Sequence, residues 1–225
     1  NLNYNTTYQY RAIAILPNGD TAFGRIKTFT TLPIVLTTVN ASNITQTKAQ
    51  LNATFIFGDV SILSKGFQYK ANNTPNNYAI VNGLLSSTDT TAMYYNLTDL
   101  IPKKNYIYKA FVVLANGDTI HGFTKTFTTS AVSITTNSAS NIQKTTATLN
   151  GNINYGDVPV ANILSKGFIF DDNDTIYATS SGNSFSYNLT GLMPHTQYHY
   201  IAFVKTIYGT YIGNSNSSFT TLYLD

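Results

Sequence analysis

The feature that most restricts the fold of this chain is a pattern of aromatic residues that occurs three times. Each copy has a Tyr-x-Tyr segment followed by Phe-Thr-Thr, and the first Tyr precedes the Phe by 21 residues every time. The copies begin at Tyr8, Tyr106 and Tyr198, so they are offset by 98 and then 92 residues. Solenoid repeats are much shorter, whereas sandwich domains with their own cores have about this length. The pattern predicts an array of similar domains.

The segments upstream of the second and third copies also match each other. Ala41-Ser-Asn-Ile44 recurs as Ala139-Ser-Asn-Ile142, and the run Ile-Leu-Ser-Lys-Gly-Phe occurs in both copies. The first copy has only its C-terminal third. We therefore expect the natural chain to continue upstream, and we predict three parts. These are an incomplete module at residues 1–32 and two complete modules at 33–130 and 131–225.

Composition excludes several classes of protein. The chain has no cysteine, so disulfides and thiolate metal sites are excluded. Its 13 Lys and Arg are scattered singly and give a net charge of only +3, which argues against nucleic acid as a partner. No apolar run reaches the length of a membrane span. Only 10% of the residues are charged, so polar uncharged side chains and tyrosine must cover the surface.

Alternating apolar residues predict strands throughout the chain. Ala49, Leu51, Ala53, Phe55 and Phe57 recur with a period of two, as do the residues of each Tyr-x-Tyr segment. Short strands separated by turn residues, without helical periodicity, predict an all-β fold of tandem antiparallel β-sandwiches. The pairs Asn18-Gly19 and Asn116-Gly117 predict type I′ hairpin turns.

A Leu-x-Pro-x-x-x-Tyr sequence precedes the second and third copies, beginning at Leu100 and Leu192. This sequence resembles the signature of fibronectin type III domains. The resemblance implies a tyrosine corner, in which a tyrosine hydroxyl is bonded to nearby backbone, at Tyr106 and Tyr198. The resemblance implies the same role for Tyr8, although the first copy has Tyr4 in place of the proline. The tryptophan usual in the family's second strand is missing.

A longer pattern, which runs from Thr145-Thr-Ala-Thr-Leu-Asn-Gly151 to Phe219-Thr-Thr221, resembles tandem repeats in surface proteins of Bacteroidota. Such repeats are similar to spacers in secreted adhesins and filaments, and they also occur beside carbohydrate-active domains. The resemblance implies an extracellular or cell-surface location. Fold alone does not identify the function.

Few residues suggest chemistry. Asp171, Asp172 and Asp174 form the one acidic cluster and are candidate Ca²⁺ ligands, although a hairpin turn explains them better. No Gly-x-Ser-x-Gly motif is present and no histidine recurs among the copies, so we expect neither an enzyme nor a cofactor.

Two kinds of surface site are also candidates. Tyr208 and Tyr211, beside the last hairpin turn, are the tyrosines we expect to be exposed for stacking on a glycan. Asp-Thr sequences resemble the O-glycosylation acceptor of Bacteroidota and place candidate glycans on Thr21, Thr90, Thr119 and Thr175.

The sequence therefore favours a non-enzymatic spacer segment of an extracellular rod, adhesin or filament. Its expected partners are further modules of the same chain or neighbouring subunits, together with glycans. Two alternatives stay open: a carbohydrate-binding or accessory module of a glycan-degrading protein, and a fibre-like exterior component of a virion.

Overall fold

The computed structural model describes residues 2–57, 60–75, 77–86, 91–171, 174–179, 182–213 and 215–223. Within these ranges the regular structure is β-strand, apart from one short 3-10 helix, η1 (Val160–Asn162). All strand pairs are antiparallel and no helix is long and apolar enough to cross a membrane, both within the described ranges. The chain is an all-β protein of tandem sandwiches, as predicted.

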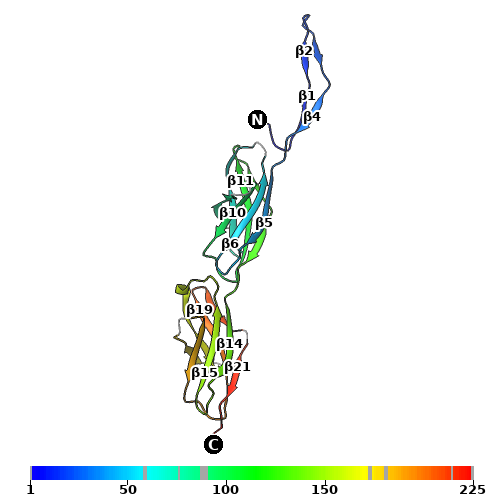
Figure 1. Cartoon of the computed structure of the whole chain (residues 1–225). Helices are drawn as coiled ribbons and strands as arrows, with labels where there is room; N and C mark the ends of the chain where they lie inside the picture. Colours follow the sequence, from blue (N-terminus) through cyan, green and yellow to red (C-terminus); the bar gives the residue numbers. More distant parts are fainter. Residues whose placement is uncertain are drawn as a thin grey trace. The chain divides into compact units, whose positions relative to one another are not determined.

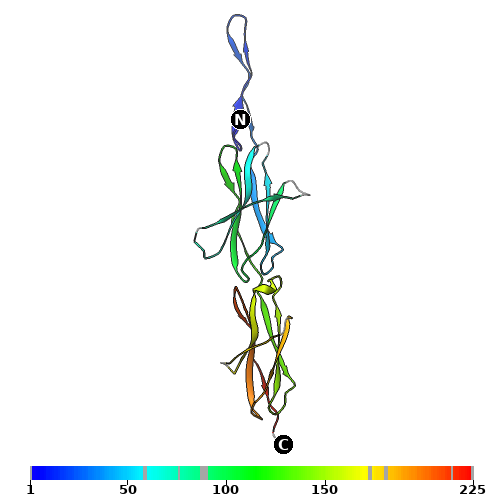
Figure 2. The same ribbon diagram turned by 90° about the vertical axis from the view of Figure 1, so that its left-hand side faces the viewer.

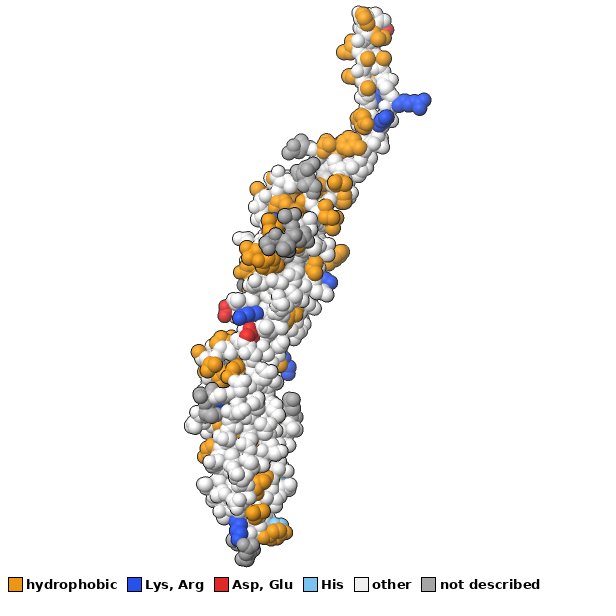
Figure 3. All heavy atoms as spheres, viewed as in Figure 1, with side chains coloured by type: hydrophobic (Ala, Val, Ile, Leu, Met, Phe, Trp, Pro, Cys, Tyr) orange, Lys and Arg blue, Asp and Glu red, His pale blue; other side chains and the backbone are white. Residues whose placement is uncertain are grey.

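Residues 2–32 form a ribbon of two chain segments (Figure 1). Its strands are β1 (Thr7–Tyr10), β2 (Ile13–Ile15), β3 (Thr21–Phe23) and β4 (Lys27–Thr30). Strand β1 pairs with β4 and β2 pairs with β3. Most of the side chains in these strands are exposed, and Figure 3 shows hydrophobic side chains along the ribbon. We call this segment the N-terminal hairpin.

The first complete sandwich follows, with two sheets facing each other (Figure 2). One sheet has the order β5-β6-β10-β9, and the other has the order β12-β11-β7-β8, with β13 also paired to β11. The strands are β5 (Val35–Ser42), β6 (Ala49–Ile56), β7 (Ile62–Ala71), β8 (Ala79–Asn82), β9 (Leu84–Leu85), β10 (Ala92–Leu97), β11 (Asn105–Leu114), β12 (Thr119–His121) and β13 (Lys125–Thr128).

The core of this sandwich follows the predicted alternation. In β6, Ala49, Leu51, Ala53 and Phe55 are buried, and Phe57 just beyond it is buried as well. In β11 every second residue from Tyr106 to Leu114 is buried, which confirms the period-two interpretation. These strands belong to opposite sheets, so their buried faces form the two sides of one core.

The second sandwich repeats this topology. Its sheets have the orders β14-β15-β18 and β17-β16-β19-β20, with β21 also paired to β19. The strands are β14 (Ser133–Ser140), β15 (Ala147–Asn154), β16 (Ile163–Phe170), β17 (Asp174–Tyr177), β18 (Ser184–Leu189), β19 (Gln197–Thr206), β20 (Gly209–Ile212) and β21 (Ser217–Thr220). The core cluster draws residues from both sheets, including Leu149, Phe168 and Tyr200.

The prediction of type I′ turns at Asn18-Gly19 and Asn116-Gly117 is wrong. Gly19 has φ of 90° and Gly117 has φ of 91°, but neither asparagine has a positive φ. The Gly19 amide donates to the Leu16 carbonyl and the Leu16 amide donates to the Asp20 carbonyl, which makes a three-residue loop. This is a type I turn closed by a left-handed glycine. Pro17 favours it because proline at the first central position fixes a negative φ.

The chain divides into two compact units whose boundaries do not follow the sequence simply. The first unit contains residues 1–42, 50–97 and 105–127, and the second contains residues 43–49, 98–104 and 128–225. The loop between β5 and β6 and the loop before β11 therefore pack as part of the second unit.

Candidate functional site

The first tyrosine of the Tyr-x-Tyr segment bonds to the turn before it in the first and third copies. The Tyr198 hydroxyl accepts a hydrogen bond from the Met193 amide at 2.8 Å, and the Tyr8 hydroxyl accepts one from the Asn3 amide at 2.7 Å. Tyr106 is buried and stacks on Phe127 with ring centroids 5.3 Å apart. In the first and third copies this is the contact that a tyrosine corner requires, because the hydroxyl bonds backbone five residues upstream.

A second element of this turn was not recognised in the sequence. The last threonine of each Phe-Thr-Thr donates its hydroxyl to a carbonyl in the turn: Thr31 to Asn3 at 2.7 Å, Thr129 to Ile101 at 2.6 Å and Thr221 to Met193 at 2.6 Å. The same hydroxyls accept from the amides of Thr6, Lys104 and Thr196. The recurrence of this threonine was the signal that could have revealed its role.

The second tyrosine of the motif joins the two sheets of each complete sandwich. The Tyr108 hydroxyl on β11 donates to the Val39 carbonyl, and the Tyr200 hydroxyl on β19 donates to the Asn137 carbonyl, both at 2.6 Å. Burial raises the pKa of Tyr108 to about 12, and burial likewise raises the pKa of Tyr200. Both hydroxyls are therefore neutral donors at physiological pH.

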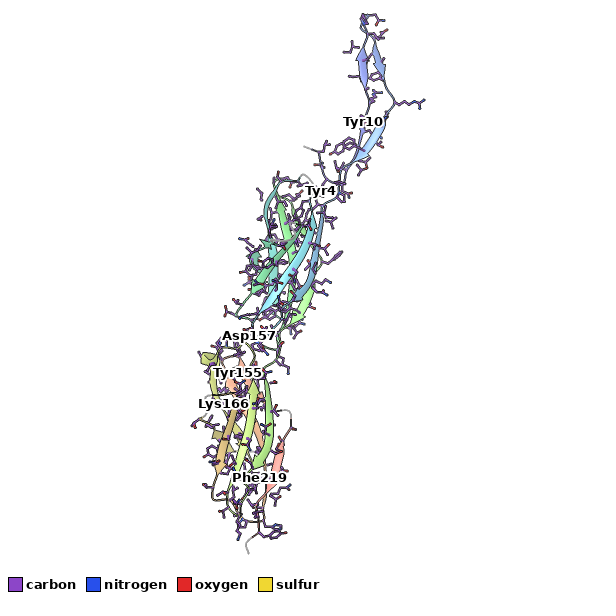
Figure 4. All side chains as sticks on the ribbon, in the orientation of Figure 1. Tyr4, Tyr10, Tyr155, Asp157, Lys166 and Phe219 are labelled. Carbon is purple, nitrogen blue, oxygen red and sulfur yellow. The ribbon has the colours of Figure 1, made fainter. Side chains whose placement is uncertain are left out.

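A polar cluster in the second unit surrounds Asp157 (Figure 4). Its carboxylate accepts from the Thr45 hydroxyl at 2.7 Å, the Thr47 hydroxyl at 2.8 Å and the Thr47 amide at 3.0 Å. The Lys48 ammonium lies 4.0 Å away, and the Asp157 side chain is 20% exposed. Burial opposes ionisation of this carboxyl, but the hydrogen bonds from Thr45 and Thr47 outweigh it and lower the pKa.

This cluster connects the loop between β5 and β6 to the loop after β15. A carboxylate with three donors and a nearby cation has little free capacity for a ligand, so its role is structural. In the sequence, Gly-Asp-Val occurs twice, at residues 58–60 and 156–158, and this repeat does not identify the donors to Asp157. The equivalent Asp59 lies outside the described residues.

Of the predicted acidic cluster, the structure describes only Asp171 and Asp174. Asp171 lies in a turn with φ of 48°, and its carboxylate accepts from the His199 amide at 3.4 Å. Asp174 begins β17 and is exposed, whereas Asp172 lies outside the described residues. No group of three or more potential metal-ligating side chains occurs in the described part of the chain. The Asp171 geometry is that of a hairpin turn.

Tyr208 and Tyr211 are less open than expected for a glycan platform. Both are half-buried and pack against the core of the second sandwich. The Tyr208 hydroxyl accepts from the Asn162 side-chain amide at 3.3 Å. Burial raises the pKa of Tyr211, with Tyr208 adding to the effect.

The candidate acceptor threonines lie on exposed strand positions. Thr21 begins β3, Thr119 begins β12 and Thr175 lies in β17, and all three are exposed. The aspartates before the first two accept side-chain bonds from Asn18 and Asn116, so they also belong to the hairpin turns. Thr90 lies outside the described residues.

Comparison with known proteins gives structural neighbours but no family. No family model matches the chain, and no curated protein matches it. The short form of the sensor domain of the anti-sigma factor RsgI4 in Pseudobacteroides cellulosolvens is 25% identical, with a TM-score of 0.37, over 44% of this chain and 96% of that one. A two-domain fibronectin type III segment of chicken tenascin is 14% identical, with a TM-score of 0.36, over 83% of this chain and 99% of that one.

A redesigned β-sandwich protein is 23% identical, with a TM-score of 0.32, over 42% of this chain and 94% of that one. The structural neighbours thus include tandem fibronectin type III domains and other β-sandwiches. The sandwich fold of this chain rests on its own strands and sheets, described above.

Proposed function

We propose that this chain is a non-enzymatic spacer segment of an extracellular rod, adhesin or filament. One observation carries the proposal: the last threonine of Phe-Thr-Thr, which recurs in all three copies, bonds to the backbone of its own module. Thr31, Thr129 and Thr221 each make the same pair of hydrogen bonds. Repetition of a structural frame, without repetition of a reactive group, supports a mechanical role.

The buried tyrosines support the same proposal. The side chains of Tyr108 and Tyr200 cross from one sheet of a sandwich to the other, and each part-buried hydroxyl-to-carbonyl bond resists separation of the sheets. Such bonds suit a module that transmits force along a chain. That the chain is not an enzyme is part of the same proposal.

A Bacteroidota cell-surface origin is the finer form of this proposal. It draws on the repeat pattern in the sequence and on the exposure of Thr21, Thr119 and Thr175, which leaves their hydroxyls open to a glycosyltransferase. Intact-mass analysis of protein from its native source tests this part. A mass above that of the bare polypeptide supports it, and the bare mass contradicts it.

Single-molecule stretching tests the mechanical role. The chain, held by its termini, should give two separate unfolding events that each release on the order of 300 Å, from roughly 95 residues at about 3.4 Å per extended residue. Tyr108→Phe should lower the unfolding force of the first sandwich only, and Tyr200→Phe should lower that of the second only. Extension without discrete events would contradict a load-bearing spacer.

The half-burial of Tyr208 and Tyr211 gives the carbohydrate-binding alternative no supporting observation. A glycan array on the intact chain separates the two functions, because a spacer should bind no glycan. The virion alternative shares the mechanical role and differs only in the assembly that contains the chain.

A further inference from the structure

The N-terminal hairpin has the same internal hydrogen bonds as hairpins that are covered in the two complete sandwiches. The Gly24 amide donates to the Ala12 carbonyl at 2.9 Å, Gly122 to Ala110 at 3.0 Å and Gly213 to Ala202 at 2.9 Å. These bonds align the three hairpins at Ala12, Ala110 and Ala202 and at the glycines that pair with them. The two covered hairpins therefore show what should lie on the first.

Burial differs sharply at equivalent positions. Tyr10 is 54% exposed, whereas Tyr108 is 0% and Tyr200 is 2% exposed. Phe29 is 43% exposed, whereas Phe127 and Phe219 are each 6% exposed. Figure 4 shows the Tyr10 side chain on the hairpin and Phe219 in the second sandwich. The aromatic face that forms half of a core elsewhere is open here.

The glycine at the middle of this face identifies the missing neighbour. A Cβ on Gly122 would lie 2.4 Å from the Thr38 hydroxyl oxygen, and a Cβ on Gly213 would lie 2.4 Å from that of Thr136. Glycine is needed at both because a threonine of the first strand passes directly over it. At Gly24 the nearest atoms belong to Ala12, at 3.4 Å or more, so the hairpin itself gives no reason for glycine.

In each complete sandwich, the first strand, which carries this threonine, accepts two hydrogen bonds from the hairpin. Thr38 accepts from the Ala110 amide and Thr136 from the Ala202 amide, both at 3.0 Å. The residue after each threonine, Val39 or Asn137, accepts from the second tyrosine. In the N-terminal hairpin, Ala12 corresponds to Ala110 and Ala202, and Tyr10 corresponds to Tyr108 and Tyr200.

The neighbouring strand edge is open as well. In the first sandwich β11 pairs with β7 along most of its length, from Tyr106 to Leu114. In the described part of the hairpin, β1 and β2 each have one partner strand, on the side of β4 and β3. An antiparallel strand like β7 would satisfy this edge.

We propose that the N-terminal hairpin is a docking site for a polypeptide segment that repeats strands β5 to β10, which lacks a hairpin of its own. A threonine of its first strand occupies the space over Gly24 and accepts from the Ala12 amide, and the next carbonyl accepts from the Tyr10 hydroxyl. An intact second copy does not fit, because its Thr38 and Thr136 are already bonded to their own hairpins. This inference does not depend on the spacer role.

A fusion protein tests the proposal within a folded chain. A second copy of residues 33–98 is joined directly ahead of Asn1, which restores the spacing of a complete module because the first copy is offset by 98 residues. Hydrogen exchange of the amides of residues 7–30 is compared between the fusion and the original chain. Exchange should slow by at least about a hundredfold in the fusion, as expected for a change from an exposed edge to a core strand.

Two substitutions make the test specific. Gly24→Ala should leave exchange unchanged in the original chain and accelerate it roughly tenfold or more in the fusion, because the added methyl meets the seated threonine. Thr28→Ala, an exposed position beside Phe29 on the opposite face of β4, is the matched control and should change neither. Equal exchange with and without the added segment would overturn the proposal. Slow exchange in the original chain, with sedimentation as a dimer, would also overturn it, since the hairpin would then be covered by a second copy.

Discussion

At the scale of single residues, stability in this chain depends on a few buried polar groups with complete hydrogen bonding. The Tyr108 hydroxyl lies in a core position with 0% exposure of the residue, and it satisfies the Val39 carbonyl of the opposite sheet. Removal of this donor leaves the Val39 carbonyl, in a part-buried position, without this hydrogen bond.

Tyr108→Phe should therefore lower the free energy of unfolding of the first unit by about 1–2 kcal/mol. Urea denaturation measured by circular dichroism checks this. Tyr10→Phe is the matched control, because Tyr10 holds the same place in the exposed hairpin and its loss should have no measurable effect. Equal effects of the two substitutions would contradict the role of the sheet-to-sheet bond.

The pH dependence of stability gives Tyr108 a second test. Its pKa is about 12 in the folded chain and about 10 in an unfolded one. The neutral hydroxyl thus favours the folded state, and this contribution is complete below pH 10 and is lost as the pH rises toward 12. The alkaline loss of stability should be smaller in Tyr108→Phe than in the unchanged chain.

Asp157→Asn should lower the stability of the second unit by about 1–2 kcal/mol, because an amide replaces a carboxylate that accepts three hydrogen bonds. The lowered pKa of Asp157 means that this stabilisation is present above about pH 4, the unfolded value, and is lost as the pH falls through the folded pKa. Denaturation curves should differ at pH 7 and converge near pH 2. Asp118→Asn, an exposed turn aspartate, is the control.

At the scale of elements, the strand alternation and the hairpin turn have different origins. Alternation follows from the period of two and needs only the local sequence. The turn depends on one residue with left-handed backbone angles. This conformation is costly for residues with a Cβ, although less so for asparagine and aspartate. In the hairpin of the first sandwich this residue is Gly117, where a Cβ would meet no atom within 4 Å.

Gly117→Ala should therefore destabilise the first unit by backbone strain alone, by about 1 kcal/mol. Gly117→Asn should cost less, because asparagine tolerates the left-handed conformation better. Thermal unfolding measures both. A loss from Asn as large as that from Ala would show that the side chain clashes, in conflict with the open space around Gly117.

At the scale of the whole chain, the compact units and the repeated modules do not coincide. The predicted modules are 33–130 and 131–225, whereas the loop 43–49 belongs to the second compact unit through residues such as Thr47. We expect each module to fold when it is expressed alone. The second module should then be less stable than in the full chain, because it lacks the loop 43–49.

Residues 33–130 and 131–225, expressed separately, should each unfold cooperatively, and residues 1–32 should not, since each module has a full set of strands and the hairpin has none to cover it. Circular dichroism and thermal melts measure this. Asp157→Asn should destabilise the full chain but not the isolated fragment 131–225, where its threonine partners are missing. Cooperative unfolding of residues 1–32 alone, or an equal effect of Asp157→Asn in both proteins, would contradict this scheme.

Much of the architecture could be predicted because its determinants are local. The alternation in β6 and β11, the antiparallel sandwich class and the turn before each tyrosine all follow from spacing and residue type. Hairpin type was predicted wrongly because Asn-Gly also suits a three-residue loop, and the pairing of Leu16 with Asp20 decides between the two.

The candidate ligand sites show the limit of the same reasoning. Exposure of Tyr208 and Tyr211 depends on how their strand packs against the core, and no periodicity reports the depth of a side chain beside a turn. Asp157 was overlooked for a similar reason, because its donors lie about 110 residues away in the chain.

The sequence by itself determined the repeat, the strand content, the buried faces and the absence of disulfides, because each depends on residue type and on neighbours a few positions apart. Only the tertiary structure decided which hydroxyl meets which carbonyl, how Asp157 is held, and why Gly122 and Gly213 must be glycine. These features require two segments distant in the chain to lie within a few ångströms of each other, and that distance is set by the packing of the sheets.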